Sequence, residues 1–127
     1  MTQALDSLTK NLFYISETDA EIVPFTFRKA ESVTAAEILY QSGHKADDGV
    51  ETLDAEAFFS RLTAVKDWFG PRENERAERF AVLKTEMENQ LRDLKVFKIG
   101  KVQIDIYVVG LDGEGRLAGV RTKAVET

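Results

Sequence analysis

The fold is decided by one stretch, Val96-Phe-Lys-Ile-Gly-Lys-Val-Gln-Ile-Asp-Ile-Tyr-Val-Val-Gly110. Apolar residues recur at every second position after Lys101, and this period of two is typical of a strand with one face in a core. Gly100 and Lys101 interrupt the alternation. Because glycine tolerates the positive φ of the first central position of a type II′ turn, they predict a two-residue hairpin.

A long helix precedes this stretch and a third strand follows it. Five apolar residues recur at spacings of three and four and predict a helix from about Glu73 to Leu94, with Asn74 as its cap; they are Phe80, Leu83, Met87, Leu91 and Leu94. Leu117 to about Glu126 has the pattern of a returning strand. We expect a three-stranded antiparallel meander with the long helix covering one face.

The first half of the chain predicts shorter elements. Residues 3–13 have helical spacing with Thr2 as a plausible cap, and residues 16–21 have the composition of an exposed acidic loop. Residues 23–28 alternate as a strand, in which Pro24 indicates an edge or a strand start. Thr34 begins a capping box for a helix that runs to about Ser42 and stops at Gly43.

Residues 50–53 are expected to be extended, and Asp54 to cap a helix that carries Phe58, Phe59 and Leu62. At 127 residues the chain fits one domain, residues 1–127, and we find no repeat or linker. The predicted fold class is therefore α+β.

Composition excludes several classes of function. The chain has no cysteine, which excludes disulfides and thiol nucleophiles, and its first residues lack the features of a secretion signal. No apolar run approaches the ~18 residues of a membrane span, so we expect a cytoplasmic protein that does not contact a membrane. A net charge of −5, from 22 acidic against 17 basic residues, disfavours direct binding of nucleic acid and favours a basic protein surface.

Little in the sequence supports an enzyme. The glycine-rich segment from Gly110 to Gly115 lies between strands, so it predicts a hairpin turn and not a phosphate-binding loop before a helix. His44 is the only histidine, and its polar neighbours favour a solvated loop residue. No ligand set for a metal or cofactor is recognisable, and we expect neither.

Three further residues are ambiguous from residue chemistry alone. Trp68 has two interpretations. We favour a core or half-buried residue, and the alternative is a recognition residue at an interface. Glu17 in its polar stretch and Thr127 at the last position have the properties of solvated residues. Spacing gives no reason to join them.

Six segments of the chain resemble segments of the nuclease A inhibitor family and occur in the same order as in that family. They are residues 12–18, 38–44, 58–61, 67–69, 102–110 and 117–127. The resemblance extends from about residue 5 to the last residue. The C-terminal string that ends Val-Glu-Thr127 is the most distinctive of these segments.

The resemblance implies an α–β–α sandwich similar to plant pathogenesis-related class 1 proteins, without enzyme activity or cofactor. It implies that the partner is a nonspecific DNA/RNA endonuclease of the ββα-metal type. We expect a monomer that forms a 1:1 complex. The resemblance also assigns partner-binding roles: Glu17 approaches the catalytic metal of the nuclease, Trp68 is an aromatic interface residue, and Thr127 reaches the active site. The alternative is a protein-interaction module on the same fold with an unrelated partner.

Overall fold

Helices and strands follow one another in nearly the order that the sequence predicts. A computed structural model of the chain describes residues 2–44 and 49–126. The elements are α1 (Thr2–Thr9), β1 (Phe13–Ile15), β2 (Asp19–Glu21), β3 (Val23–Lys29), α2 (Ala35–Ser42), β4 (Val50–Asp54), α3 (Ala55–Thr63), α4 (Pro71–Gln90), β5 (Arg92–Ile99), β6 (Gln103–Leu111) and β7 (Arg116–Val125).

The expected meander of β5, β6 and β7 is the centre of a larger sheet. The strand order is β3-β7-β6-β5-β4, and every neighbouring pair is antiparallel. Pro24 lies on β3, an edge strand, as predicted. Strands β1 and β2 form a separate antiparallel ribbon. The α+β class with a mainly antiparallel sheet is confirmed.

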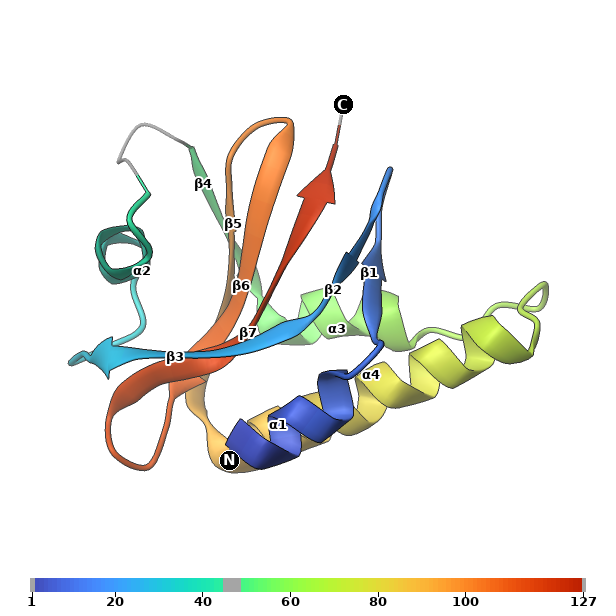
Figure 1. Ribbon diagram of the computed structural model, residues 1–127, viewed down its shortest axis with the longest axis horizontal. Helices are drawn as coiled ribbons and strands as arrows, with labels where there is room; N and C mark the ends of the chain where they lie inside the picture. Colours follow the sequence, from blue (N-terminus) through green and yellow to red (C-terminus); the bar gives the residue numbers. More distant parts are fainter. Residues whose placement is uncertain (1, 45–48, 127) are drawn as a thin grey trace.

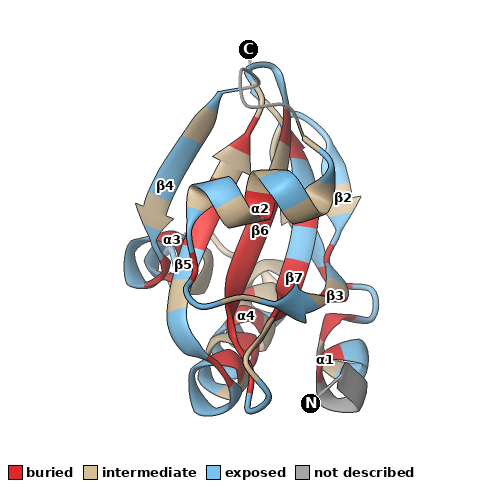
Figure 2. Cartoon of the chain, turned by 90° about the vertical axis from the view of Figure 1, so that its left-hand side faces the viewer, coloured by how far each residue is buried: buried red, intermediate tan, exposed pale blue. Residues whose placement is uncertain are grey.

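Helices lie on both faces of the sheet (Figure 1). Alternate residues of β6 enter two separate apolar clusters: Ile106 and Val108 pack with α1, α3 and α4, whereas Val109 and Leu111 pack on the side of α2. Figure 2 shows α2 crossing in front of the buried residues of β6. This layering agrees with the expected sandwich, whereas the similarity to pathogenesis-related class 1 proteins stays a prediction.

The predicted caps of the shorter helices are confirmed. The Thr34 side chain accepts a hydrogen bond from the Glu37 N–H, and Gly43 ends α2 at a φ of 83°. The Asp54 side chain accepts from the Glu56 N–H at the start of α3. Each cap satisfies a backbone group that the helix itself leaves unpaired.

The first helix is shorter than predicted. It ends at Thr9, and the chain turns at Asn11, whose φ is 58°. Arg79 of α4 donates hydrogen bonds to the carbonyls of Leu8, Lys10 and Asn11 at 3.1, 2.5 and 3.2 Å. A cation from a distant helix thus closes α1, and sequence spacing cannot anticipate that contact.

The expected acidic loop at residues 16–21 is wrong in its second half, because Asp19–Glu21 is strand β2. Tyr14 of β1 points inward and stacks on Phe58 with ring centroids 5.9 Å apart. The opposite face of the ribbon is exposed, so its residues can be polar. Composition therefore resembles that of a loop although the backbone is paired.

The long helix also lies earlier than predicted. It begins at Pro71, with Gly70 as the cap residue in place of Asn74, and the Glu73 side chain accepts from the Gly70 N–H at 3.1 Å. It ends at Gln90; Leu91 is buried just beyond it. The apolar spacing continues past the true end because residues after the helix enter the same core.

The turn between β5 and β6 is longer than the predicted two residues. Residues 100–102 separate the strands, and the last cross-strand pair joins Ile99 to Asp105. The Gly100 N–H donates to the carbonyl of Gly49 at 3.1 Å, and its φ is 119°. Gly100 is therefore needed for its positive φ, but in a wider turn that also contacts the start of β4.

Candidate functional site

Glu17 lies at the tip of the β1–β2 ribbon, in a turn that hydrogen bonds define locally. Both the N–H and the hydroxyl of Ser16 donate to the carbonyl of Thr18, each at 3.0 Å, and Ser16 Oγ accepts from the Thr18 N–H at 3.4 Å. Glu17 itself is exposed. The turn therefore presents this residue at the surface from a fixed backbone.

The same turn is joined to the last strand of the sheet. The Glu17 N–H donates to the Val125 carbonyl at 3.4 Å, and the Val125 N–H donates to Ser16 Oγ at 3.1 Å. Further along the ribbon, the buried Thr122 hydroxyl lies 3.2 and 3.1 Å from the carbonyls of Ala20 and Glu21. The ribbon is thus fastened to β7 at several points, although the two segments are far apart in the sequence.

The end of β7 is held from its other side as well. The Glu126 N–H donates to the Val102 carbonyl at 2.9 Å, and its carboxylate pairs with Lys98 Nζ at 3.3 Å. Thr127 lies outside the described residues. In Figure 1 the tip of the β1–β2 ribbon and the end of β7 lie at the same end of the molecule.

Trp68 lies in the connection between α3 and α4, and its predicted burial is wrong: 75% of it is exposed. Its ring meets that of Phe69 edge-on, with centroids 4.7 Å apart and an interplanar angle of 84°. Phe69, which is partly buried, occupies the inward position that the sequence favoured for tryptophan. One aromatic residue of the pair anchors the connection, and the other is left at the surface.

The ribbon and this connection border one small hollow of about 120 Å³. Phe13 and Ile15 of β1 line it from one side and Phe69 from the other. Phe13 and Ile15 are 39% and 45% exposed, so β1 also presents apolar side chains at the surface. Sequence reasoning missed these two residues, because the predicted helix through residue 13 hid the strand that exposes them.

A crevice of about 250 Å³, lined by both basic and acidic side chains, adjoins the ribbon. Arg72, Arg76 and Arg79 of α4 line it together with Asp19 of β2. The Arg79 guanidinium already donates hydrogen bonds to the carbonyls at the end of α1. Arg72 and Arg76 form no ion pair with any described residue. Two cations are therefore displayed close to the acidic ribbon.

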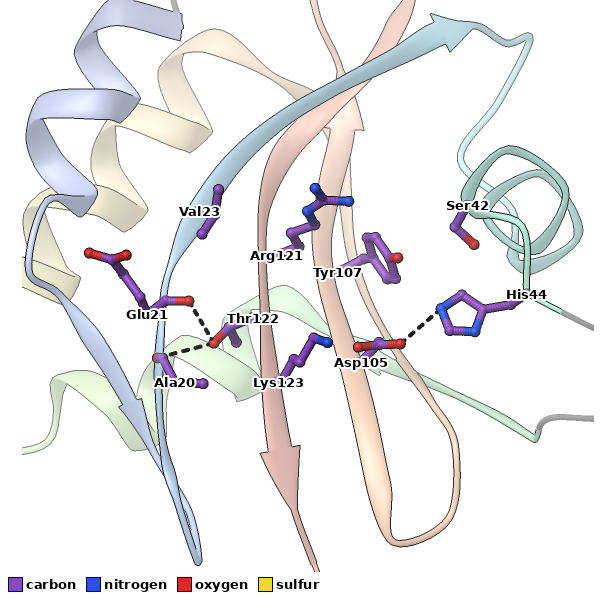
Figure 3. A pocket seen from close by; sticks show the side chains of 10 residues that line it. All are labelled: Ala20, Glu21, Val23, Ser42, His44, Asp105, Tyr107, Arg121, Thr122 and Lys123. Carbon is purple, nitrogen blue, oxygen red and sulfur yellow. Dashed lines mark hydrogen bonds and ion pairs between the residues drawn. The ribbon is translucent and has the colours of Figure 1, made fainter.

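A hollow of about 530 Å³ lies on the α2 face of the sheet (Figure 3). His44 reaches it from the end of α2, and its Nε2 lies 3.0 Å from Oδ2 of Asp105 on β6. His44 lies in the loop after α2, as predicted, but its side chain is only 19% exposed and is therefore less solvated than expected. Spacing could not detect this contact, since His44 and Asp105 meet only when α2 packs on the sheet.

Tyr107 forms part of the floor of that hollow. Burial of the ring raises the pKa of Tyr107, and the nearby Asp105 charge raises it further; hydrogen bonds with Ser42 and Arg121 act in the opposite direction and are outweighed. The hydroxyl is therefore neutral at physiological pH and can donate a hydrogen bond.

The segment from Gly110 to Gly115 is a hairpin region, as predicted, although Gly110 itself belongs to β6. A Cβ at Gly110 would lie 2.7 Å from the carbonyl oxygen of Arg92, so the neighbouring strand requires glycine there. Within residues 2–44 and 49–126, no three His, Cys, Asp or Glu side chains are grouped to hold a metal ion. No helix in the same residues is long and apolar enough to cross a bilayer.

Fold and site together define a small α+β protein that presents a glutamate-bearing turn, fastened to the end of its sheet, beside an exposed aromatic connection. The family described as nuclease A inhibitor-like protein matches residues 1–127, and the chain belongs to this family. The family's description indicates a nuclease as the protein partner and a role without catalysis. No curated protein matches the sequence.

Proposed function

We propose that this chain inhibits a metal-dependent, sugar-nonspecific DNA/RNA endonuclease by binding in its active site. In this proposal the Glu17 carboxylate approaches the catalytic divalent cation, Thr127 reaches into the same site, and Trp68 packs at the rim. The inhibitor needs no metal or cofactor of its own and acts as a monomer in a 1:1 complex.

One observation carries the proposal: the Glu17 N–H donates to the carbonyl of Val125, two residues before Thr127. A nuclease active site accepts one phosphodiester at a time, so groups that imitate it must converge. The hydrogen bond brings the acidic turn to the end of β7 and so supports a single shared target for both.

The chemistry of the partner makes a carboxylate an effective imitation of the substrate. A metal-dependent nuclease binds phosphate oxygens with a divalent cation and basic side chains. A glutamate carboxylate offers oxygen ligands of the same charge sign at neutral pH. Unlike a phosphodiester, it contains no bond that the enzyme can hydrolyse.

Fixed geometry adds to affinity because less conformational freedom is lost on binding. The Ser16 and Val125 hydrogen bonds define the backbone at Glu17 before any partner arrives. Glu126 is likewise held by Val102 and Lys98. The backbone at Glu17 and the residue that precedes Thr127 therefore start from ordered positions.

Trp68 supplies the apolar part of the proposed interface. Large aromatic residues near the centre of an interface commonly dominate its energetics. The hollow between Phe69 and β1 places Phe13 and Ile15 in the same region, so a partner that covers the turn can also cover Trp68. Val65 in the same connection is exposed as well.

The acidic balance of the chain supports encounter with a basic cleft, and added salt should slow that encounter. We place the protein in the cytoplasm, where it would protect the cell from a nuclease that the same cell makes for export.

The test is stoichiometric. The purified chain is mixed with a metal-dependent nonspecific nuclease, magnesium and plasmid, and digestion should stop near one inhibitor per enzyme, with a matching complex on size-exclusion chromatography. Full nuclease activity at excess inhibitor, with no complex, would refute this target. Pull-down from the native host then separates the remaining cases, since recovery of a different class of protein would favour a general interaction module.

A further inference from the structure

The hollow on the α2 face has a floor of two cross-strand pairs that nuclease inhibition does not use. Asp105 lies directly opposite Lys123, and Tyr107 lies directly opposite Arg121. The end of α2 forms one wall and the β2–β3 segment forms the other. The hollow of about 530 Å³ is within the range of roughly 300–1,000 Å³ that small-molecule sites occupy.

The sheet is left open here because α2 is short. Ile38 packs on the apolar half of this face, together with Val109 and Leu117, and the helix then stops at Gly43. Beyond that point the outward residues of β6 and β7 become polar and charged. Side chains of opposite character thus divide one sheet face into a covered half and an open half.

The two cations of the open half have no ion-pair partner within the described residues. Arg121 and Lys123 form no ion pair there. The Asp105 carboxylate is directed toward His44, 3.0 Å away, and Figure 3 shows the Glu21 carboxylate pointing away from both cations. The two cations and the two carboxylates that line the hollow therefore balance in number, but no carboxylate of the described residues lies within ion-pair distance of Arg121 or Lys123.

We infer that this hollow binds a small molecule through a phosphate or carboxylate group, which Arg121, Lys123 and the Tyr107 hydroxyl hold. The guanidinium of arginine offers parallel N–H donors to two oxygens of one anion, and lysine adds a point charge. Tyr107 is 5% exposed, so its ring is fixed and its hydroxyl is a positioned donor. The hollow exceeds the size of a lone oxyanion, so the ligand carries additional atoms toward Ser42 and Val23.

Nuclear magnetic resonance titration of the ¹⁵N-labelled chain tests the inference with the anionic group alone. Sodium phosphate and sodium acetate are added in separate experiments, with sodium chloride at matched ionic strength as reference. We expect saturable shifts of the amides at positions 105, 107, 121 and 123 with at least one of the two oxyanions. Equal, non-saturating shifts in all three salts would overturn the inference.

Matched variants locate the binding. Arg121→Gln should weaken the oxyanion by about tenfold, the effect of losing a charge-assisted hydrogen bond. Lys101→Gln removes the same charge from an exposed turn outside the hollow and should leave the affinity unchanged. Equal loss in both variants would show general charge attraction and refute a site. The outcome is independent of nuclease inhibition, because no nuclease is present.

Discussion

Two turns of this protein carry an acidic residue, and the surroundings of the two residues differ. Asp112, between β6 and β7, is buried, and its carboxylate accepts from the N–H groups of Glu114 and Arg116 at 2.8 and 3.0 Å and from Arg116 Nε at 3.0 Å. Glu17, between β1 and β2, is exposed, and its turn is closed by Ser16 and the backbone.

The two turns lie at opposite ends of the sheet (Figure 1). The difference teaches that an acidic residue in a polar turn can serve folding or recognition. What separates the two roles is whether the turn's donors are directed at its carboxylate. Each residue therefore serves as a control for the other.

Replacing Asp112 should produce the largest loss of stability. Asp112→Ala leaves two backbone N–H groups without their acceptor, and hydrogen bonds to charged groups contribute about 1.5–3 kcal/mol. We expect the free energy of unfolding to fall by about 2–3 kcal/mol in urea denaturation. Nuclease inhibition by the folded variant should be unchanged, and a selective loss of inhibition would contradict the assignment of this turn to folding.

Lowering the pH should remove the contribution of the Asp112 carboxylate to the stability of the fold. Burial alone raises the pKa of Asp112, but hydrogen bonds from the Arg116 and Glu114 N–H groups and the Arg116 guanidinium outweigh it and lower the pKa below 3.8. A lowered folded-state pKa means stability that is present above the unfolded value and lost as pH falls through the folded one. The difference in stability between the native chain and Asp112→Ala should therefore shrink below about pH 3.8.

Replacing Glu17 should weaken nuclease binding and leave the stability of the fold almost unchanged. Glu17→Ala is expected to weaken the nuclease complex about 30-fold, which is about 2 kcal/mol, because truncating a central interface residue typically costs that much. The free energy of unfolding should change by less than about 0.5 kcal/mol, as for most surface substitutions. Glu31→Ala removes the same charge from another exposed position and is the control. Equal inhibition by both variants would disprove the role of Glu17.

Trp68 extends the comparison of the two acidic turns to an exposed apolar residue. Trp68→Ala should weaken the complex about tenfold, or about 1.4 kcal/mol, with little change in thermal stability because the ring is largely exposed. Tyr40 is 73% exposed on α2, so Tyr40→Ala is a matched truncation outside the proposed interface. A loss of inhibition in the Tyr40 variant of the same size would place the interface elsewhere.

Local chemistry explains which parts of the fold the sequence predicts. The strand β6 and the caps at Thr34 and Asp54 depend on neighbouring residues, and all three are confirmed. The expectation that only one face of this strand lies in a core is wrong, because helices cover both faces of the sheet. The end of α1 depends on Arg79, which is distant in the sequence, and its predicted position is wrong. Patterns over a few residues thus locate elements, whereas contacts between elements set their ends.

The candidate site likewise depends on contacts between elements that local sequence patterns do not predict. Residue chemistry alone gives no reason to connect Glu17 with the end of the chain; only the family resemblance joined them. The hydrogen bond between Glu17 and Val125 requires the folded sheet. The usual burial of tryptophan favours Trp68 for the core, yet Phe69 beside it is the more buried of the two. His44 and Asp105 meet only across two elements.

The smallest effects should come from loosening the Glu17 turn without touching its carboxylate. Ser16→Ala removes the acceptor of the Val125 N–H, and Thr122→Val removes the hydroxyl that contacts Ala20 and Glu21. Each lost hydrogen bond should lower stability by about 1 kcal/mol. Amide exchange at Val125 should accelerate in the Ser16 variant, and the nuclease affinity should fall about threefold in both.

Ser60→Ala removes a hydroxyl from an exposed position on α3 and should change neither quantity. If the two turn variants lose stability but keep full affinity, the Glu17 carboxylate becomes ordered only when the partner binds, and the turn does not position it in advance. The contrast with Asp112 would then be one of burial alone, because the backbone around Glu17 would contribute nothing to recognition.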